Sequence, residues 1–194
     1  MFGKIIGCIL AYLIGGIPFG YIVVKLKRGV DIRNYGSGNI GATNVGRVLG
    51  FKWGLFVFIL DFLKGFLPAL LGRFIYGLDI GLLFGIFAII GHILTPYLGG
   101  KGGKGVATSV GVFSAIVPII ALLSFILWGI LLVIFKIVSL SSIVASIFAG
   151  MLVVIYGKTL FLKIVGFLIP IVIILTHREN IKRLLRKEER KIKI

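Results

Sequence analysis

Residues 106–135 read VATSVGVFSAIVPIIALLSFILWGILLVIF, thirty residues in a row without a charged side chain. As one helix this stretch would be about 45 Å long, whereas the hydrocarbon core of a bilayer is only about 30 Å thick. Folded back near Pro118, it would instead form two short helices of about 22 Å each. The number of membrane crossings, and the side on which each loop lies, therefore depends on this stretch.

The rest of the chain also predicts a membrane protein. Of its 194 residues, 59% are hydrophobic and 14% are charged, whereas soluble domains carry about 25% charged residues. Five further apolar stretches approach the length of one crossing, and they are 2–24, 53–71, 80–98, 137–155 and 161–176. We therefore expect an all-α polytopic protein whose residues 1–194 form a single membrane domain.

The distribution of positive charge favours the hairpin. The formal net charge is +16, from 22 Lys and Arg against 6 Asp and Glu, and cytoplasmic loops of membrane proteins are enriched in Lys and Arg. Here the basic residues gather in 25–52 and in the tail 177–194, which includes Lys193. Both regions face the cytoplasm only if the number of crossings is odd, so the sequence predicts about seven helices, with the N-terminus outside and the C-terminus in the cytoplasm. The tail also places Leu184 and Leu185 among basic residues, as in a helix that lies on an anionic membrane surface.

Segments rich in glycine and small polar residues fall on the predicted cytoplasmic side. They are 36–47 (GSGNIGATNVGR), 98–108 (LGGKGGKGVAT), 136–142 (KIVSLSS) and 177–180 (HREN). Turn formation alone explains any one of them. Their coincidence on one side predicts a shared site.

The second of these segments contains the clearest candidate for anion binding. In residues 99–105, here called the glycine-rich loop, glycines alternate with Lys101 and Lys104 directly before a helix predicted from Val106. Backbone amides freed by glycine, a helix N-terminus and two ammonium groups would form a phosphate cradle. The spacing is not that of a nucleotide-hydrolysing P-loop, because Gly105 follows Lys104 where serine or threonine is needed. The candidate phosphate-binding residues are Gly100, Lys101, Gly102, Gly103, Lys104 and Gly105.

The first segment matches Gly-x-Gly-x-x-Gly at Gly36, Gly38 and Gly41. A dinucleotide site is not predicted, because no strand precedes the match and Asp61, twenty residues later, falls in a membrane helix. We expect a flexible loop that donates hydrogen bonds, with an arginine for bidentate contact to a phosphate or carboxylate. Its candidate residues are Ser37, Asn39, Thr43, Asn44 and Arg47.

Four ionisable residues lie in or at the ends of the predicted helices. Asp61 and Lys64 are three residues apart and costly in hydrocarbon, so we expect them to pair or to face the interior, either as a structural pair or as support for the phosphate site. His92 is predicted to be a hydrogen-bonded interior histidine, with support for the phosphate site as the alternative. His177, at the end of the last crossing, suits a general base, a phosphate ligand or a histidine on the helix dipole. One cysteine and two histidines predict neither a metal site nor a cofactor.

Together these features predict lipid chemistry on a phosphorylated substrate, with a membrane carrier for a small organic phosphate as the alternative. Transport pathways place polar groups through the membrane midplane, and here only Asp61 and Lys64 lie deep. Nucleic-acid binding is not predicted, because no soluble folded domain is present to carry specificity.

In its motifs and their order the chain resembles the bacterial acyl-phosphate:glycerol-3-phosphate acyltransferase family. The matching motifs are Ser37-Gly38-Asn39-x-Gly41-x-x-Asn44-x-x-Arg47, Asp61-x-x-Lys64-Gly65, Gly91-His92, Gly99-x-Lys101-Gly102-Gly103-Lys104-Gly105, Ser139-Leu140-Ser141-Ser142 and His177-Arg178-x-Asn180. One departure is Lys136, where the pattern has arginine, so the charge is kept without the bidentate geometry.

The resemblance implies transfer of a fatty acyl group from acyl phosphate, not acyl-CoA, to the 1-hydroxyl of sn-glycerol 3-phosphate, giving lysophosphatidic acid and phosphate. It implies an enzyme of phospholipid synthesis in the bacterial inner membrane, with its site facing the cytoplasm. The glycine-rich loop with Lys104 would hold glycerol 3-phosphate. Further candidates are Ser37, Asn39 and Arg47 for acyl phosphate, Ser142 and Asn180 for the polar surroundings, and His177 as general base unless a substrate phosphate takes the proton. Anionic lipids are the other expected partners.

Overall fold

The computed structural model describes residues 1–192 of the chain, so Lys193 of the predicted basic tail lies outside them. The described part is helical and divides into two compact units, one from Met1 to Ile116 and one from Val117 onward. Five helical spans in it are long and apolar enough to cross a membrane, counting Phe2–Arg28 and Leu78–Leu98 as one span each, or six if one bent pair also counts as a span. The expected all-α polytopic class is confirmed, but the expected count of about seven crossings exceeds these five or six, and the orientation stays a prediction. The expectation of a single domain stays a prediction.

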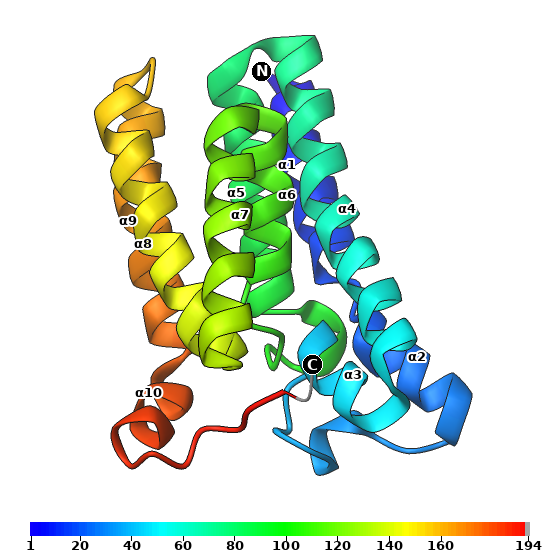
Figure 1. Ribbon diagram of the computed structural model, residues 1–194. Coiled ribbons are helices and arrows are strands. Elements are labelled where there is room, and N and C mark those ends of the chain that lie inside the picture. The colour runs from blue at the N-terminus through cyan, green and yellow to red at the C-terminus, as the bar shows by residue number, and fades with distance from the viewer. Residues whose placement is uncertain (193–194) are drawn as a thin grey trace. The chain divides into compact units, whose positions relative to one another are not determined.

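The first unit contains six α-helices and two short 3₁₀ helices (Figure 1). They are α1 (Phe2–Gly16), α2 (Phe19–Arg28), η1 (Ile32–Asn34), α3 (Ala42–Leu49), α4 (Phe51–Tyr76), α5 (Leu78–Ile93), η2 (Pro96–Leu98) and α6 (Val106–Ile116). Within this unit α4 packs against both α5 and α6, and α1 packs against α5.

The first apolar stretch, expected as one helix over residues 2–24, is broken into two helices. Pro18 has no N–H and restricts the residue before it, so α1 ends at Gly16 and α2 begins at Phe19. The break frees two carbonyls. Thr95 Oγ1 donates to the carbonyl of Gly16 at 2.6 Å, and Lys64 Nζ donates to that of Ile17 at 2.8 Å.

Helices α4 and α6 approach closely through glycine. A Cβ at Gly65 would overlap the backbone of Thr108, and a Cβ at Gly111 would overlap the backbone of Phe62. Small residues at such crossings allow the backbones of membrane helices to meet. This contact fixes the start of α6, and with it the end of the glycine-rich loop, against α4.

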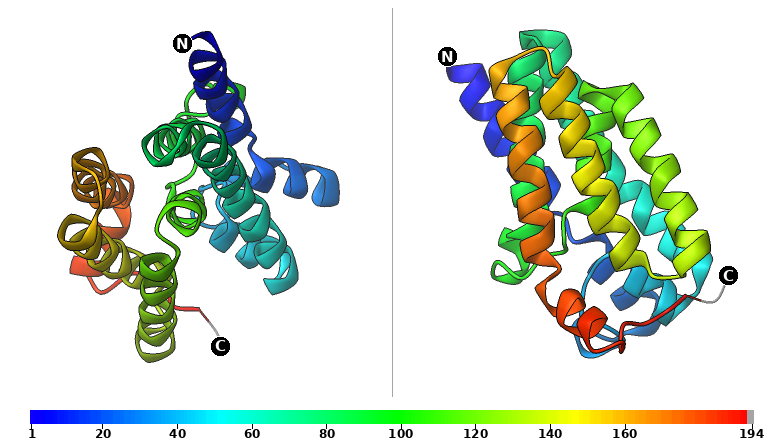
Figure 2. Two further views of the ribbon diagram at one scale, coloured as in Figure 1. Left: turned by 90° about the horizontal axis from the view of Figure 1, so that it is seen from above. Right: turned by 60° about the vertical axis from the view of Figure 1, so that its left-hand side comes forward.

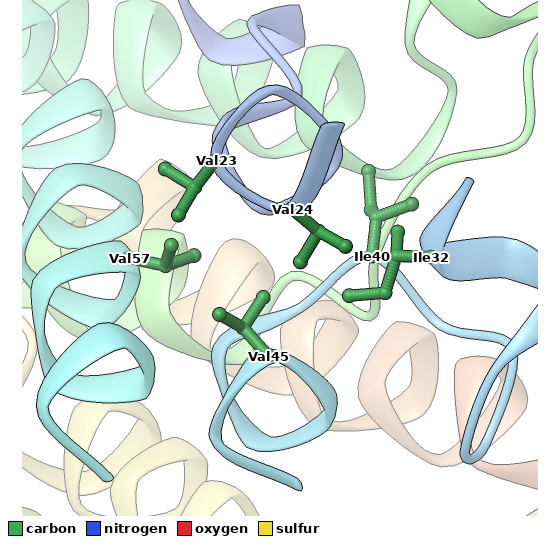
Figure 3. Close-up of a cluster of buried hydrophobic side chains, with 6 residues drawn as sticks. All are labelled: Val23, Val24, Ile32, Ile40, Val45 and Val57. Carbon is green, nitrogen blue, oxygen red and sulfur yellow. The ribbon is translucent and has the colours of Figure 1, made fainter. Parts of the chain in front are cut away.

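An apolar cluster anchors the polar segment that joins α2 to α4. Figure 3 shows its side chains converging from α2, η1, the loop after it, α3 and α4, and they are Val23, Val24, Ile32, Ile40, Val45 and Val57. Ile32, Val45 and Val57 are fully buried. Burial of such side chains stabilises the fold by about 1.5–3 kcal/mol each, so the loop between η1 and α3 is held at both ends.

The stretch that decides the topology breaks where the hairpin prediction placed the turn. Helix α6 ends at Ile116, and α7 (Pro118–Phe135) begins with proline at its first position, where the missing N–H is not needed. The predicted equal arms are wrong, because 11 and 18 residues make helices of about 16 Å and 27 Å. Arg73 Nη1 donates to the carbonyl of Ala115 at 2.5 Å and so caps the end of α6.

The second unit consists of α7, α8 (Val138–Tyr156), α9 (Leu160–Thr176) and α10 (Arg178–Leu185). Within it α8 packs against both α7 and α9. Between α9 and α10 the chain bends by 64°, and the right-hand view of Figure 2 shows α10 leaving the end of α9. The predicted amphipathic tail is therefore helical only as far as Leu185.

Candidate active site

The glycine-rich loop folds back onto the end of α5. Its amides at Gly100, Lys101, Gly102 and Gly103 donate to the carbonyls of Thr95 (2.9 Å), Leu98 (3.3 Å), Ile93 (3.0 Å) and His92 (3.0 Å), respectively. The last carbonyls of a helix have no partner within it, and the loop supplies donors to two of them, those of His92 and Ile93; its other two donors bond to Thr95 and to Leu98 of η2. These amides are thus engaged, and the prediction that glycine leaves them free for phosphate is wrong.

Positive charge and the start of α6 remain as anion-binding features of the loop. Lys101 is exposed and Lys104 is half-buried. Gly105 has φ +85°, a left-handed conformation that suits glycine, and α6 begins at the next residue, as predicted. Any anion held here would meet ammonium groups and a helix N-terminus.

A buried charged cluster lies directly behind this loop. Lys64 Nζ is 2.8 Å from Asp61 Oδ1, which confirms the predicted pair, and both side chains are at most 3% exposed. His92 Nδ1 lies 3.7 Å from the same carboxylate oxygen. Within residues 1–192 that nitrogen has no hydrogen-bond partner, so a hydrogen bond of His92 through its other ring nitrogen stays a prediction. Gly103 packs against the His92 ring so closely that a Cβ there would overlap it.

Asn44 organises the first polar segment. Its Oδ1 accepts from Ser37 N at 2.8 Å, and its Nδ2 donates to the carbonyls of Tyr35 and Asn39, both at 2.9 Å. Asn39 Oδ1 in turn accepts from Gly41 N at 2.8 Å. Asn44 is 1% exposed, so its amide holds the loop in shape, and the direct phosphate contact predicted for it stays a prediction.

The same segment is more ordered than expected, because residues 42–49 form α3 rather than a flexible loop. Thr43 and Arg47 lie exposed on that helix, while Ser37 and Asn39 are half-buried before it. Gly41, in extended conformation, occupies the N-cap position, which glycine tolerates well.

A cavity of about 440 Å³ connects the two glycine segments within the first unit. Gly38 and Ile40 line it from one loop, Lys101 and Gly102 from the other. Three further lining residues were not singled out from the sequence, namely Asp31, Arg33 and Asn34.

Arg33 brings a guanidinium to this cavity and pairs there with Asp31. Its Nη2 lies 2.6 Å from Asp31 Oδ2, and its Nε contacts both carboxylate oxygens at 3.0 Å. These hydrogen bonds hold the pKa of Asp31 below its ordinary value. The sequence signal was an Asp-x-Arg spacing within a basic loop, where Arg33 had counted only toward orientation in the membrane.

In the second unit, His177 lies at the break between α9 and α10. Its side chain is buried, and Nδ1 lies 2.8 Å from the carbonyl oxygen of Ile173. A carbonyl only accepts, so Nδ1 carries a proton and Nε2 of the neutral ring is an acceptor. This tautomer is the one that a general base acting through Nε2 requires.

Ser142 and Asn180 are both held by side chains of the same unit. Trp128 Nε1 donates to Ser142 Oγ at 3.2 Å. Asn180 Nδ2 donates to Glu189 Oε1 at 2.6 Å, and Ser139 Oγ donates to the same oxygen at 2.9 Å. Glu189 was not among the residues singled out from the sequence, because it lies in a tail that is otherwise mostly basic.

The structure thus brings together the two glycine segments in the first unit, and Ser139 with Asn180 in the second. The expectation that all four polar segments form one site stays a prediction. Within residues 1–192 no three His, Cys, Asp or Glu side chains are grouped so that they could hold a metal ion.

Comparison with known proteins gives consistent matches over almost the full length. The family model described as glycerol-3-phosphate acyltransferase matches residues 5–187. A glycerol-3-phosphate acyltransferase of Aquifex aeolicus is 48% identical over 183 residues, covering 93% of this chain and 95% of that protein. One from Staphylococcus aureus is 44% identical and covers 97% of this chain and 98% of that protein.

Solved structures agree with these sequence matches. A crystal structure of PlsY (YgiH), an integral membrane glycerol 3-phosphate acyltransferase in its glycerol 3-phosphate form, gives a TM-score of 0.95 at 44% identity. It covers 98% of this chain and 96% of that chain. The lysophosphatidic acid form of PlsY gives a TM-score of 0.89 at 45% identity, with the same coverage.

Proposed function

The chain belongs to the glycerol-3-phosphate acyltransferase family, and from this premise we propose that it transfers a fatty acyl group from acyl phosphate to the 1-hydroxyl of sn-glycerol 3-phosphate. The products are lysophosphatidic acid and inorganic phosphate. Family membership decides between the transferase and the carrier that the sequence left open. The protein is a multi-pass integral membrane enzyme.

The observation that carries the proposal is the cavity between the two glycine segments. Its volume of about 440 Å³ lies within the range of small-molecule sites, about 300–1,000 Å³. Lys101 brings positive charge to its lining, the Arg33 guanidinium there is paired with Asp31, and Gly38 and Gly102 let the backbone approach a ligand. This combination suits a small organic phosphate such as glycerol 3-phosphate.

We assign the phosphate of glycerol 3-phosphate to Lys104 together with Lys101 and the start of α6. The amides of residues 100–103 already bond to the end of α5 and to the turn that follows it, so the loop contributes its shape and its lysines. Ser37, Asn39 and Arg47 would position acyl phosphate and its carbonyl oxygen, with Ser142 and Asn180 as further polar contacts.

The reaction needs no nucleophile from the protein, because acyl phosphate is a mixed anhydride with a good leaving group. The 1-hydroxyl oxygen attacks the acyl carbonyl carbon, and an ester bond forms as the bond between that carbon and the phosphate oxygen breaks. The phosphate leaves with the electron pair. Positioning of the two substrates and stabilisation of the carbonyl oxyanion are the main tasks of the enzyme.

The hydroxyl proton goes to Nε2 of His177 or to a phosphate oxygen of the substrate. The hydrogen bond from Nδ1 to the carbonyl of Ile173 supports His177 as the proton acceptor, because it leaves Nε2 as the ring nitrogen that can accept. We place this chemistry on the cytoplasmic face of the bacterial inner membrane, where the basic tail would meet anionic lipids.

The experiment is a product assay with purified protein in lipid vesicles, labelled glycerol 3-phosphate and palmitoyl phosphate. We expect lysophosphatidic acid and inorganic phosphate in equal amounts. Uptake of labelled glycerol 3-phosphate into the vesicles without acylation would refute the proposal and favour a carrier.

A further inference from the structure

Glu189 is an acidic residue in a tail that is otherwise basic. It follows directly on Arg186, Lys187 and the exposed Glu188, and it lies beyond residues 5–187, which the family model matches. Its side chain is nevertheless only 4% exposed. Burying a carboxylate is costly unless it is paired and hydrogen-bonded, so its surroundings must compensate.

Three donors of different kinds converge on this carboxylate. Asn180 Nδ2 and Ser139 Oγ donate to Oε1 at 2.6 Å and 2.9 Å. Arg183 Nε donates to Oε2 at 2.7 Å. These hydrogen bonds outweigh burial and hold the pKa of Glu189 below its ordinary value, so the carboxylate stays ionised at neutral pH.

The donors come from two separate elements of the second unit. Ser139 lies in the first turn of α8, whereas Asn180 and Arg183 lie on α10. The tail is also held by its backbone, since Glu188 N donates to the carbonyl of Arg183 and Ile192 N to that of Lys136, both at 2.8 Å. Glu189 therefore ties the starts of α8 and α10 together at the two polar segments assigned to substrate.

Exposed surface ion pairs contribute little to stability, typically about 0–1 kcal/mol. The hydrogen bonds of Glu189 differ from such pairs because they are buried. Asn180 is 6% exposed and Ser139 is 5% exposed, so the carboxylate fixes groups that are out of bulk solvent. A carboxylate only accepts hydrogen bonds, so the Asn180 side chain must turn its NH2 group, and not its oxygen, toward Glu189.

We infer that Glu189 is a positioning residue of the acyltransferase site, which orients the Asn180 amide so that its second Nδ2 hydrogen can be donated to a phosphate-bearing substrate. This inference rests on the proposed function. The C-terminal tail would then help to position a substrate-binding residue, in addition to contacting the membrane. The effect is on substrate binding, because Asn180 is assigned to binding.

The test compares Glu189→Gln with Glu188→Gln, which makes the same chemical change at the exposed neighbouring residue. The KM for each substrate, kcat and the melting temperature are measured on the full-length protein in vesicles. Glu189→Gln should raise at least one KM about tenfold, with kcat nearly unchanged. Glu188→Gln should match the wild type, and Glu189→Asp should fall between the two.

A double-mutant cycle with Asn180→Ala separates positioning from general stability. If Glu189 acts through Asn180, adding Glu189→Gln to Asn180→Ala raises KM little further. Additive effects on KM, or a lowered melting temperature with KM unchanged, would overturn the inference. A wild-type protein that forms no lysophosphatidic acid would instead refute the proposed function.

Discussion

The Asp61–Lys64 pair predicts strong coupling between two mutations inside the membrane domain. The Lys64→Met substitution removes the ammonium group that lies 2.8 Å from Asp61 and 2.8 Å from the carbonyl of Ile17. Breaking a buried ion pair costs about 3–5 kcal/mol, and a carbonyl left without its donor costs about 1–3 kcal/mol. We therefore expect Lys64→Met to lower the free energy of unfolding by at least about 4 kcal/mol.

The Asp61→Asn substitution leaves the Lys64 charge buried without its partner and should cost about 3–5 kcal/mol. The double variant removes both charges, so only the unpaired Ile17 carbonyl remains, at about 1–3 kcal/mol. The double variant should therefore be more stable than Lys64→Met alone. The coupling energy should exceed about 3 kcal/mol.

The assay is reversible unfolding in mixed detergent micelles, followed by circular dichroism or tryptophan fluorescence. Lys52→Met is the matched control, because Lys52 is an exposed lysine on the same helix α4, and it should change stability by less than about 0.5 kcal/mol. Additivity of the two single substitutions within about 0.5 kcal/mol would refute the reasoning.

Three further predictions concern the site itself. Gly103→Ala places a methyl group against the His92 ring, so it should displace the glycine-rich loop and raise the KM for glycerol 3-phosphate in steady-state kinetics; an unchanged KM would contradict the packing argument. Lys104→Ala should raise the same KM about tenfold or more through loss of a charge-assisted contact, and an unchanged KM would remove Lys104 from the phosphate site. His177→Gln should lower kcat about 100-fold if His177 is the general base, whereas near-normal turnover in the same assay would assign the proton to a substrate phosphate.

Composition and charge were enough to predict an all-α membrane protein and some of its helix breaks, but not the full division into helices. The break before Pro118 was expected because two basic regions had to share one side, and the Asp61–Lys64 pair was expected because residues three apart on a helix are neighbours. The first inference uses the charge of whole loops, and the second uses the spacing of two residues within one helix. Hydropathy reports that a stretch is apolar, but not where its backbone hydrogen bonds go, so the break at Pro18 was missed.

The details of the site depend on contacts between residues far apart in the chain. The amides of residues 100–103 bond to the end of α5 and to the turn that follows it, and the number of glycines in the loop does not indicate this. The Asn44 side chain could bind a ligand by its chemistry, yet its amide is hydrogen-bonded to the backbone of Tyr35, Ser37 and Asn39. Glu189 reaches Ser139 across fifty positions, a separation at which sequence spacing carries no signal.

The most direct test of the central claim is donor specificity. Purified protein is given glycerol 3-phosphate with either palmitoyl phosphate or palmitoyl-CoA, and lysophosphatidic acid is quantified by mass spectrometry. The proposed mechanism predicts product with palmitoyl phosphate and none above background with palmitoyl-CoA. Product formed from palmitoyl-CoA, with none from palmitoyl phosphate, would contradict it.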